Sequence, residues 1–284
     1  MIKKIALFTV VTAFSTLLAA NTLPESLNVP GGVVQVRLGS LDTPAPEVFF
    51  NKHRVLVTHD EQQWLALVGI PLETEVGQQS VSVTTEGKTT TLPFTIAYKE
   101  YPAQYLTIKN KRMVNPEAED TQRISAELVL INKALGTWTE QAQVDTDFMA
   151  PVDGRLSGVF GSRRFFNKQS KNPHSGLDIA APVGTPIKAP ASAKVISVGD
   201  YYYNGNCVFL DHGQGLISGY FHMTHVDVQP GEQVNQGDVL GTVGATGRVT
   251  GPHLHWNIYL NNTKVDPALF IADDIPRLDA RNHK

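Results

Sequence analysis

Short apolar runs separated by turn-forming residues dominate the chain from residue 24 to residue 99. The runs are rich in valine, isoleucine and threonine, which favour strands, and glycine, proline or polar residues lie between them. The runs span residues 31–39, 54–57, 64–70, 80–83 and 91–96. Strands that recur about every dozen residues are typical of a small β-sandwich, so we expect a sandwich-like domain over residues 21–104.

One later segment has the apolar spacing of a helix instead. Its stripe follows an i, i+4, i+7, i+11 pattern and consists of Ile124, Leu128, Ile131 and Leu135. Asn115 can cap the helix, Pro116 suits its first turn, and acidic residues follow where the helix dipole favours them. We expect a helical linker over residues 105–147, packed across the sandwich or against the domain that follows.

The remainder of the chain returns to a β pattern. Glycine or proline marks most turns between residues 148 and 272, and residues 273–284 have the composition of a polar tail. The expected fold class is therefore mostly β, with an N-terminal sandwich-like domain, one linking helix and a C-terminal β-rich domain.

The first twenty residues differ from the rest of the chain. Two lysines precede a mostly apolar run over residues 5–18, and two alanines close it. This is the pattern of a secretory signal peptide, which we place at residues 1–20. An uncleaved membrane anchor is disfavoured because the run is shorter than the ~20 apolar residues that a span needs. We expect an exported protein, in the periplasm or alternatively secreted, without stable membrane insertion after cleavage.

Composition and charge narrow the possible partners. The chain has 284 residues, 42% hydrophobic and 18% charged, which is ordinary for a globular protein. Its formal charge of −3 becomes more negative once the lysines of the signal peptide are removed, and nothing indicates a nucleic-acid partner. Cys207 is the only cysteine, so no intramolecular disulfide can form, and we expect it to be buried in a strand.

Two short motifs carry the candidate chemistry: His174-x-x-x-Asp178 and His253-x-His255. Both separations are even, so each pair would project from one face of an extended strand. Glycine and proline around both motifs favour strand over helix and exclude a helical His-Glu-x-x-His site. Together with His222 these residues indicate a zinc site. Two imidazoles and one carboxylate would leave a coordination position for water, which is typical of catalytic zinc.

The motifs belong to a longer pattern that resembles a known family. It comprises residues 160–164 (FGSRR), 174–186 (HSGLDIAAPVGTP), 220–223 (YFHM) and 246–256 (TGRVTGPHLHW). These segments resemble the lysostaphin-like, or LytM-type, zinc metallo-endopeptidases, which cut the peptide cross-bridges of peptidoglycan. The resemblance covers about residues 150–267 and implies a lysostaphin-like peptidase domain over residues 148–272.

The resemblance also implies roles for individual residues. The matching His174, Asp178 and His255 would be ligands of one zinc ion, and His222 and His253 would flank the metal-bound water. The chain would then be a zinc-dependent endopeptidase that hydrolyses the cross-links between peptidoglycan peptide stems through a metal-activated water. Zinc lowers the pKa of its bound water toward ~7, which makes hydroxide available at neutral pH.

Two features of the sequence bear on the roles of the residues around the zinc: a departure from the family pattern and the lack of an acidic residue that could act as the base. Asn257 stands where many members carry glutamate, two residues after the last ligand. No acid adjoins a ligand between residues 212 and 260, so a histidine must act as the base. His222 and His253 jointly take the roles of water-orienting base and oxyanion stabiliser, without a decision on which does which.

Two alternatives to a cell-wall enzyme remain. A non-enzymatic member could activate other wall hydrolases, but such relatives have lost metal ligands and this chain keeps its whole set. A secreted protease acting on proteins is the other alternative, and only substrate assays separate it from a wall hydrolase.

Overall fold

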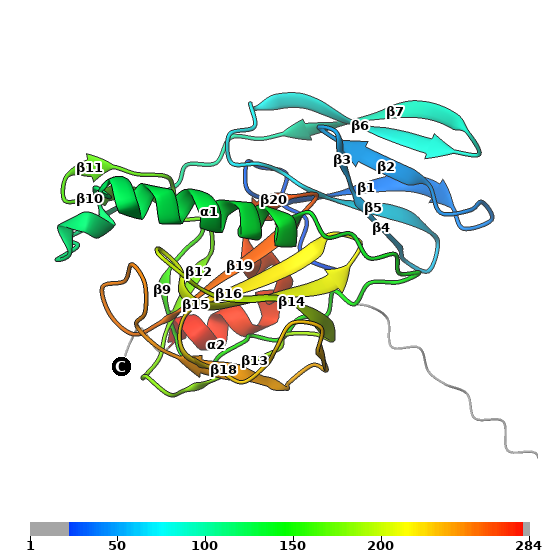
Figure 1. Cartoon of the computed structure of the whole chain (residues 1–284). Coiled ribbons are helices and arrows are strands. Elements are labelled where there is room, and N and C mark those ends of the chain that lie inside the picture. Colours follow the sequence, from blue (N-terminus) through cyan, green and yellow to red (C-terminus); the bar gives the residue numbers. More distant parts are fainter. Residues whose placement is uncertain (1–22, 281–284) are drawn as a thin grey trace, which may run out of the picture.

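A computed structural model describes residues 23–280 of the chain (Figure 1). The expected signal peptide, residues 1–20, lies outside the described residues. Within them the chain is mostly strands, which confirms the expected fold class. The α-helices of the described part are α1 (Ala118–Leu135) and α2 (Ile275–Ala280), and no helix in that part is both long and apolar enough to span a bilayer.

The N-terminal strands form two facing sheets. They are β1 (Val33–Ser40), β2 (Glu47–Phe50), β3 (His53–Arg54), β4 (Leu56–His59), β5 (Gln63–Gly69), β6 (Gly77–Thr85) and β7 (Lys88–Ile96). One sheet has the order β1-β5-β4 and the other β3-β2-β6-β7. Alternate residues such as Val34, Val68 and Val81 point between the sheets and are buried, so an apolar core holds the two layers together. All five expected strands are found, whereas β2 was not predicted.

The C-terminal strands form a larger antiparallel sheet, which lies below the sandwich in Figure 1. They are β9 (Arg155–Gly158), β12 (Leu177–Ala180), β13 (Pro186–Lys188), β14 (Ala193–Tyr201), β15 (Gly205–Gly213), β16 (Leu216–Val226), β17 (Gln233–Val234), β18 (Val239–Val243), β19 (Leu254–Leu260) and β20 (Thr263–Val265). The main order is β17-β14-β15-β16-β19-β12-β9, with β18 paired to β13 and β16. This order places β12, β16 and β19 side by side, although they lie far apart in sequence.

The chain enters the linker through a small separate sheet. Strand β8 (Ala103–Leu106) crosses the expected boundary at residue 104 and pairs in parallel with β10 (Arg163–Phe166), which also pairs with β11 (Gln169–Ser170). A 3₁₀ turn, η1 (Lys111–Met113), then leads into α1. The linker is therefore tied by hydrogen bonds to the C-terminal part of the chain.

Helix α1 differs from the expected helix at its start and in its buried face. Its N-cap is Glu117 rather than Asn115, because the Asp120 side chain accepts a hydrogen bond from the Glu117 amide and completes a capping box. Ile131 and Leu135 pack with the last turn against β14 and β15, but Leu128 is 49% exposed. Only Ile131 and Leu135 of the predicted stripe join this apolar cluster, because the helix nearer its start contacts the end of β14 through polar bonds of Arg123 and Glu127 instead.

Two side-chain amides join the sandwich to the larger sheet. The Asn261 amide donates to the carbonyl of Gly69 at 3.0 Å and accepts from its N–H at 2.7 Å. Gln214 makes the same pair of hydrogen bonds with the backbone of Val57. Both amides thus satisfy edge groups of the β1-β5-β4 sheet that would otherwise be buried without partners.

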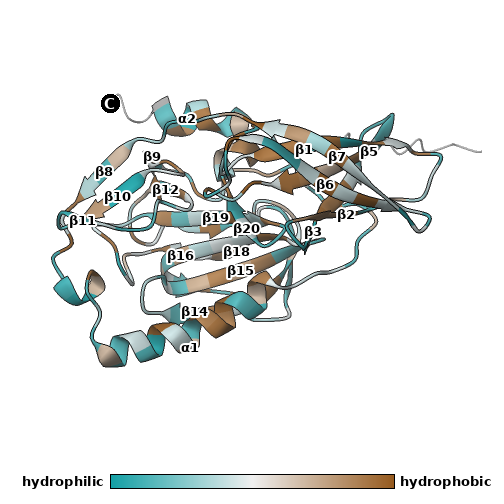
Figure 2. Cartoon of the chain, turned by 90° about the horizontal axis from the view of Figure 1, so that it is seen from above, coloured by the Kyte–Doolittle hydropathy of each residue, from teal (hydrophilic) through white to brown (hydrophobic). Residues whose placement is uncertain are grey.

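A continuous apolar core supports this junction. It combines Leu56 and Leu67 from the sandwich with Trp256 and Ile258 from β19 (strongly hydrophobic residues are brown in Figure 2). The chain end contributes to the same core, because Leu278 of α2 is fully buried in it. The expected polar tail over residues 273–284 is therefore wrong in its N-terminal part, and residues 281–284 lie outside the described range.

Candidate metal centre

Strand pairing brings the candidate metal ligands together. Asp178 of β12 lies directly opposite His255 of β19 in an antiparallel register. Directly opposed residues in such a pair have Cβ atoms about 5 Å apart, so their side chains meet on one face. On β19 the alternate residues Trp256 and Ile258 face the apolar core, which leaves His255 on the other face. The alternation that builds the core therefore also aims a ligand at the site.

His174 joins them from a loop. It precedes β12, so the prediction that His174 and Asp178 share one strand face is wrong for His174. The chain between them turns tightly over β19 at Gly176, where a Cβ atom would lie 2.1 Å from Asn257 Oδ1 and 2.4 Å from the Trp256 carbonyl oxygen. Glycine at this position lets the loop approach closely enough for His174 to reach the other two candidate ligands. The prediction that the site is not helical is confirmed.

The donor atoms of the three residues converge. His174 Nε2 lies 2.9 Å from Asp178 Oδ1, and His255 Nδ1 lies 2.7 Å from the same oxygen. The two imidazole nitrogens are 2.9 Å apart. His174 and Asp178 are buried, and the His255 side chain is 12% exposed. Among residues 23–280, His174, Asp178 and His255 form the group whose donor atoms lie close enough together to hold one metal ion.

The hydrogen-bond roles of these atoms fit a cation. His174 Nδ1 donates to the Val159 carbonyl at 2.9 Å, so in the neutral ring Nε2 carries a lone pair. That lone pair faces a carboxylate oxygen of Asp178, which is also an acceptor. Two acceptors at hydrogen-bond distance repel unless a proton or a cation lies between them, and a histidine held in this way is typical of a metal ligand.

The protonation states also suit metal binding. Burial raises the pKa of Asp178, but His174 and His255 beside it outweigh this and hold its pKa well below the usual range. Burial lowers the pKa of His255 to about 4. At neutral pH the group is therefore a carboxylate next to neutral imidazole, the forms that coordinate divalent metals.

Arg164 holds the second oxygen of the aspartate. Its Nη2 donates to Asp178 Oδ2 at 2.9 Å, and its Nε donates to Gln104 of β8 at 3.2 Å. Asp178 is thereby oriented with only Oδ1 directed at the histidines. The sequence pattern contained Arg164, but nothing in it indicated this role, because the ion pair depends on how β10 lies against β12.

His222 reaches the site through an irregularity in β16. The register between β15 and β16 shifts beside it, and its φ is +64°, a left-handed conformation that is uncommon for a residue other than glycine. Its Nδ1 donates to the Thr246 carbonyl at 2.9 Å, which leaves Nε2 free to act. Burial, followed by the like charges of His255 and His253, lowers its pKa well below 6.5.

His253 has the same tautomer for a similar reason. Its Nδ1 donates to the Gly251 carbonyl at 2.8 Å, and its Nε2 lies 3.7 Å from Asp178 Oδ1. Its ring centroid is 4.9 Å from that of His222. The loop over residues 244–253 thus orients both histidines through backbone carbonyls, which leave no signature in a sequence.

The side chain of Asn257 makes no hydrogen bond to a candidate ligand among the described residues. It is buried, its Nδ2 donates to the Tyr259 hydroxyl at 2.9 Å, and its Oδ1 has no hydrogen-bond partner among the described residues. Asn257 therefore stands where many family members carry glutamate, but its side chain bonds to Tyr259 of the same strand and not to His255.

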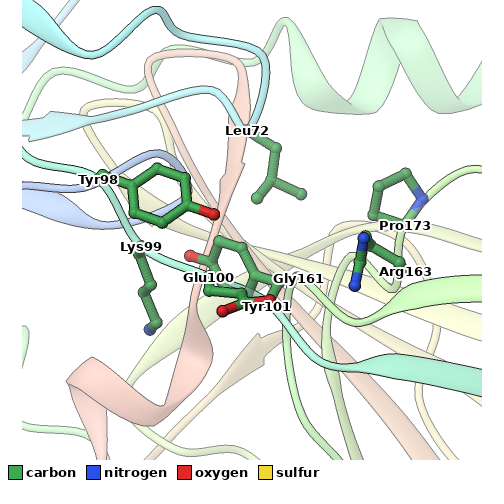
Figure 3. A pocket seen from close by; sticks show the side chains of 8 residues that line it. All are labelled: Leu72, Tyr98, Lys99, Glu100, Tyr101, Gly161, Arg163 and Pro173. Atoms are coloured by element: carbon green, nitrogen blue, oxygen red, sulfur yellow. The ribbon is translucent and has the colours of Figure 1, made fainter.

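A separate pocket lies where residues 98–101, at the end of the expected N-terminal domain, meet the segment before His174 (Figure 3). It is lined by Leu72, Tyr98, Lys99, Glu100, Tyr101, Gly161, Arg163 and Pro173. None of the metal-ligand candidates lines it, so the pocket is a feature of the junction.

Comparisons with known proteins agree with the fold and the site. The family "Peptidase family M23" matches residues 172–267, and "Peptidase family M23 N-terminal domain" matches residues 27–99. The crystal structure of a putative peptidase M23 from Pseudomonas aeruginosa is 43% identical with a TM-score of 0.73, covering 86% of this chain and 95% of that one.

Two curated relatives are similar over the C-terminal part. Peptidoglycan DD-endopeptidase ShyC of Vibrio cholerae is 40% identical over 120 residues, which are 42% of this chain and 28% of the relative. The DD-carboxypeptidase/endopeptidase Mpg of Neisseria gonorrhoeae is 38% identical over 113 residues, which are 40% of this chain and 26% of the relative. The matched region thus spans little more than a quarter of each relative's length.

Proposed function

The chain belongs to peptidase family M23, and from this premise we propose that it is a zinc-dependent endopeptidase that hydrolyses peptide cross-links of bacterial peptidoglycan. The observation that carries the proposal is the convergence of His174 Nε2, Asp178 Oδ1 and His255 Nδ1. Such a set leaves a position open on a tetrahedral ion, as catalytic zinc requires.

The substrate class rests on the relatives. Their names describe peptidoglycan DD-endopeptidases and a DD-carboxypeptidase/endopeptidase. The region that matches these relatives contains the candidate metal ligands. Of the relatives' properties, the peptide-bond hydrolysis is therefore the one that we carry over to this chain most directly. We therefore take peptidoglycan peptide stems as the substrate.

The roles of the residues follow from their geometry. His174, Asp178 and His255 would hold one zinc ion, which supplies Lewis acidity and lowers the pKa of water at the site. His222 and His253 each present a free Nε2, because each donates from Nδ1 to a backbone carbonyl. One would accept the proton of the attacking water, and the other would donate to the developing oxyanion. The geometry is similar for both, so the division of roles stays open.

We also propose the location and the domain division expected from the sequence. Export after cleavage of residues 1–20 would bring the enzyme to the periplasm, where its substrate lies. Residues 21–104 would form the N-terminal domain, residues 105–147 the linker and residues 148–272 the peptidase domain.

A regulator without activity is a weaker candidate. It would have no need for three ligands held in a buried cluster together with two oriented histidines. A protease that acts on proteins would use the same site, so the choice of substrate must be tested directly.

The test is hydrolysis of purified sacculi by the mature chain, loaded with zinc, with and without a chelator. Mass spectrometry of the released fragments should show uncross-linked muropeptides that vanish with the chelator and return with added zinc. The His174→Ala variant serves as the inactive control. If zinc-loaded protein leaves sacculi intact but cleaves unfolded proteins, the protease alternative holds. If it cleaves neither, the proposed activity is wrong.

A further inference from the structure

An arginine that the proposed chemistry does not use lies in the loop that orients both helper histidines. Arg248 follows Thr246, whose carbonyl holds His222, and precedes Gly251, whose carbonyl holds His253. The loop connects β18 to β19 and therefore leads directly into the strand of His255. Any substrate that reaches these histidines approaches the loop that carries Arg248.

Two aromatic rings hold the Arg248 side chain. Its guanidinium carbon lies 4.2 Å from the ring centroid of Tyr203 and 5.1 Å from that of Phe166. Arginine stacked in this way keeps its N–H edge directed outward in the plane of the group, while its faces are covered. The guanidinium is therefore oriented before any ligand binds.

The charge of Arg248 is poorly compensated. Among residues 23–280, no carboxylate is within ion-pair distance of it or contributes to its electrostatic surroundings. The Nη1 atom of Arg248 donates a long hydrogen bond, of 3.4 Å, to the carbonyl of Met113 in η1. Burial lowers the pKa of Arg248, and the like charge of Arg164 lowers it further. A guanidinium with most of its five donors free of protein acceptors favours an incoming anion.

Arg164 links this guanidinium to the metal centre. Both arginines lie against the ring of Phe166, with guanidinium carbons 5.8 Å and 5.1 Å from its centroid. Arg164 is already paired with Asp178 and Gln104, whereas Arg248 is not paired. The two side chains therefore differ in their contacts: Arg164 is bonded to Asp178, and Arg248 adds a second positive charge close enough to Arg164 to act on it.

We propose that Arg248 determines specificity by binding a carboxylate of the substrate residue on the amine side of the scissile bond. This inference rests on the proposed function. Most peptide bonds inside a chain have no charged group beside them. A carboxylate lies next to the scissile nitrogen when the carbon that bears the amine also carries a free carboxylate, as in the last residue of a stem or in a cross-link made through a diamino diacid. A guanidinium fork binds carboxylates through paired N–H···O bonds, so it would select such bonds over those without a neighbouring carboxylate.

The test compares two probes that differ only in this group. They are acetyl-L-Lys-D-Ala-D-Ala with a free carboxylate and the same peptide as its carboxamide. Binding is measured by calorimetry or NMR titration on metal-free full-length protein, and kcat/KM is measured on the zinc-loaded enzyme. Loss of a charge-assisted hydrogen-bonded pair should lower affinity or kcat/KM by about 10- to 100-fold. The wild type should prefer the carboxylate by about this factor in both measurements.

Three variants separate recognition from structure. Arg248→Gln should abolish the preference, and Arg248→Lys should restore part of it, because a lysine keeps the charge without the fork. Lys168→Gln removes one positive charge from an exposed position two residues after Phe166 and should keep the full preference. Melting temperatures of all variants check their folding.

The outcomes distinguish the subsite from the activity. A wild type that does not distinguish acid from amide, or an Arg248→Gln variant that keeps the full preference, overturns the subsite. If the zinc-loaded protein hydrolyses neither peptide nor sacculi, the proposed function fails, while the binding ratio still decides the subsite.

Discussion

Arg164 and Asp178 form a short ion pair at the edge of the metal centre, with Nη2 of the arginine 2.9 Å from Oδ2 of the aspartate. Both side chains are largely shielded, at 17% and 10% exposure. The pair holds Asp178 so that one oxygen faces the histidines. The arginine thus orients a candidate metal ligand.

Replacing Arg164 by methionine should therefore weaken zinc binding by about 10- to 100-fold, since partners of metal ligands typically contribute that much. Competition with a fluorescent zinc chelator measures the change. Arg163→Met is the matched control, because Arg163 is exposed and pairs with no ligand. Equal zinc affinity in the two variants would mean that Asp178 is oriented without its partner.

Loss of a ligand and loss of a helper should give different phenotypes. His174→Ala removes a donor atom 2.9 Å from Asp178 Oδ1 and should yield protein without stoichiometric zinc. His253→Ala should keep zinc and lose about 10²- to 10⁴-fold in kcat. Metal content by atomic emission, measured beside kcat on the same preparations, decides the assignment. Equal zinc loss in both variants would make His253 a ligand.

His212 should make the fold sensitive to acid. It is buried in β15, where its Nε2 lies 2.8 Å from Ser218 Oγ, and burial lowers its pKa from 6.5 to about 4. Because the unfolded chain binds the proton more readily, stability from this group is complete above pH 6.5 and falls as the pH drops toward 4. The loss should reach about 3 kcal/mol.

Urea unfolding of metal-free protein at several pH values measures this effect. His212→Gln should be less stable at pH 7 but should lose less stability between pH 6.5 and 4. Parallel curves for wild type and variant would show that another group causes the acid sensitivity.

Cys207 should be inert in the folded protein. It is fully buried in β15, and burial raises the pKa of its thiol to about 12. Thiolate is the reactive form, so labelling with Ellman's reagent at pH 8 should be negligible until denaturant is added, when one thiol per chain should react. Rapid labelling of native protein would show that the strand opens locally.

Asn261 should be important for the junction between the two β regions. Asn261→Ala removes both hydrogen bonds to the Gly69 backbone and should lower the free energy of unfolding by about 2 to 4 kcal/mol. Asn262→Ala is the control, because Asn262 is exposed and has a similar left-handed backbone. Denaturant midpoints of both variants measure the difference. If the two variants are equally stable, the junction rests on its apolar contacts.

The sequence by itself determined the elements and the donor types. Strand formers between turn residues predicted the sandwich strands, and glycine and proline around His253-x-His255 predicted an extended strand there, which is β19, because these preferences depend on near neighbours along the chain. The family motifs contained all three candidate ligands, since their residue types and spacing are local features. Burial of Cys207 was predicted for the same reason.

Tertiary structure alone decided how those donors are oriented. The position of His174 in a loop, the capping of α1 by Glu117 and the exposure of Leu128 all depend on which surfaces meet. The partners of Asp178, His222 and His253 are a distant arginine and two backbone carbonyls. Every residue carries a carbonyl, and this ion pair requires strands of two different sheets to come together, so neither leaves a pattern in the sequence.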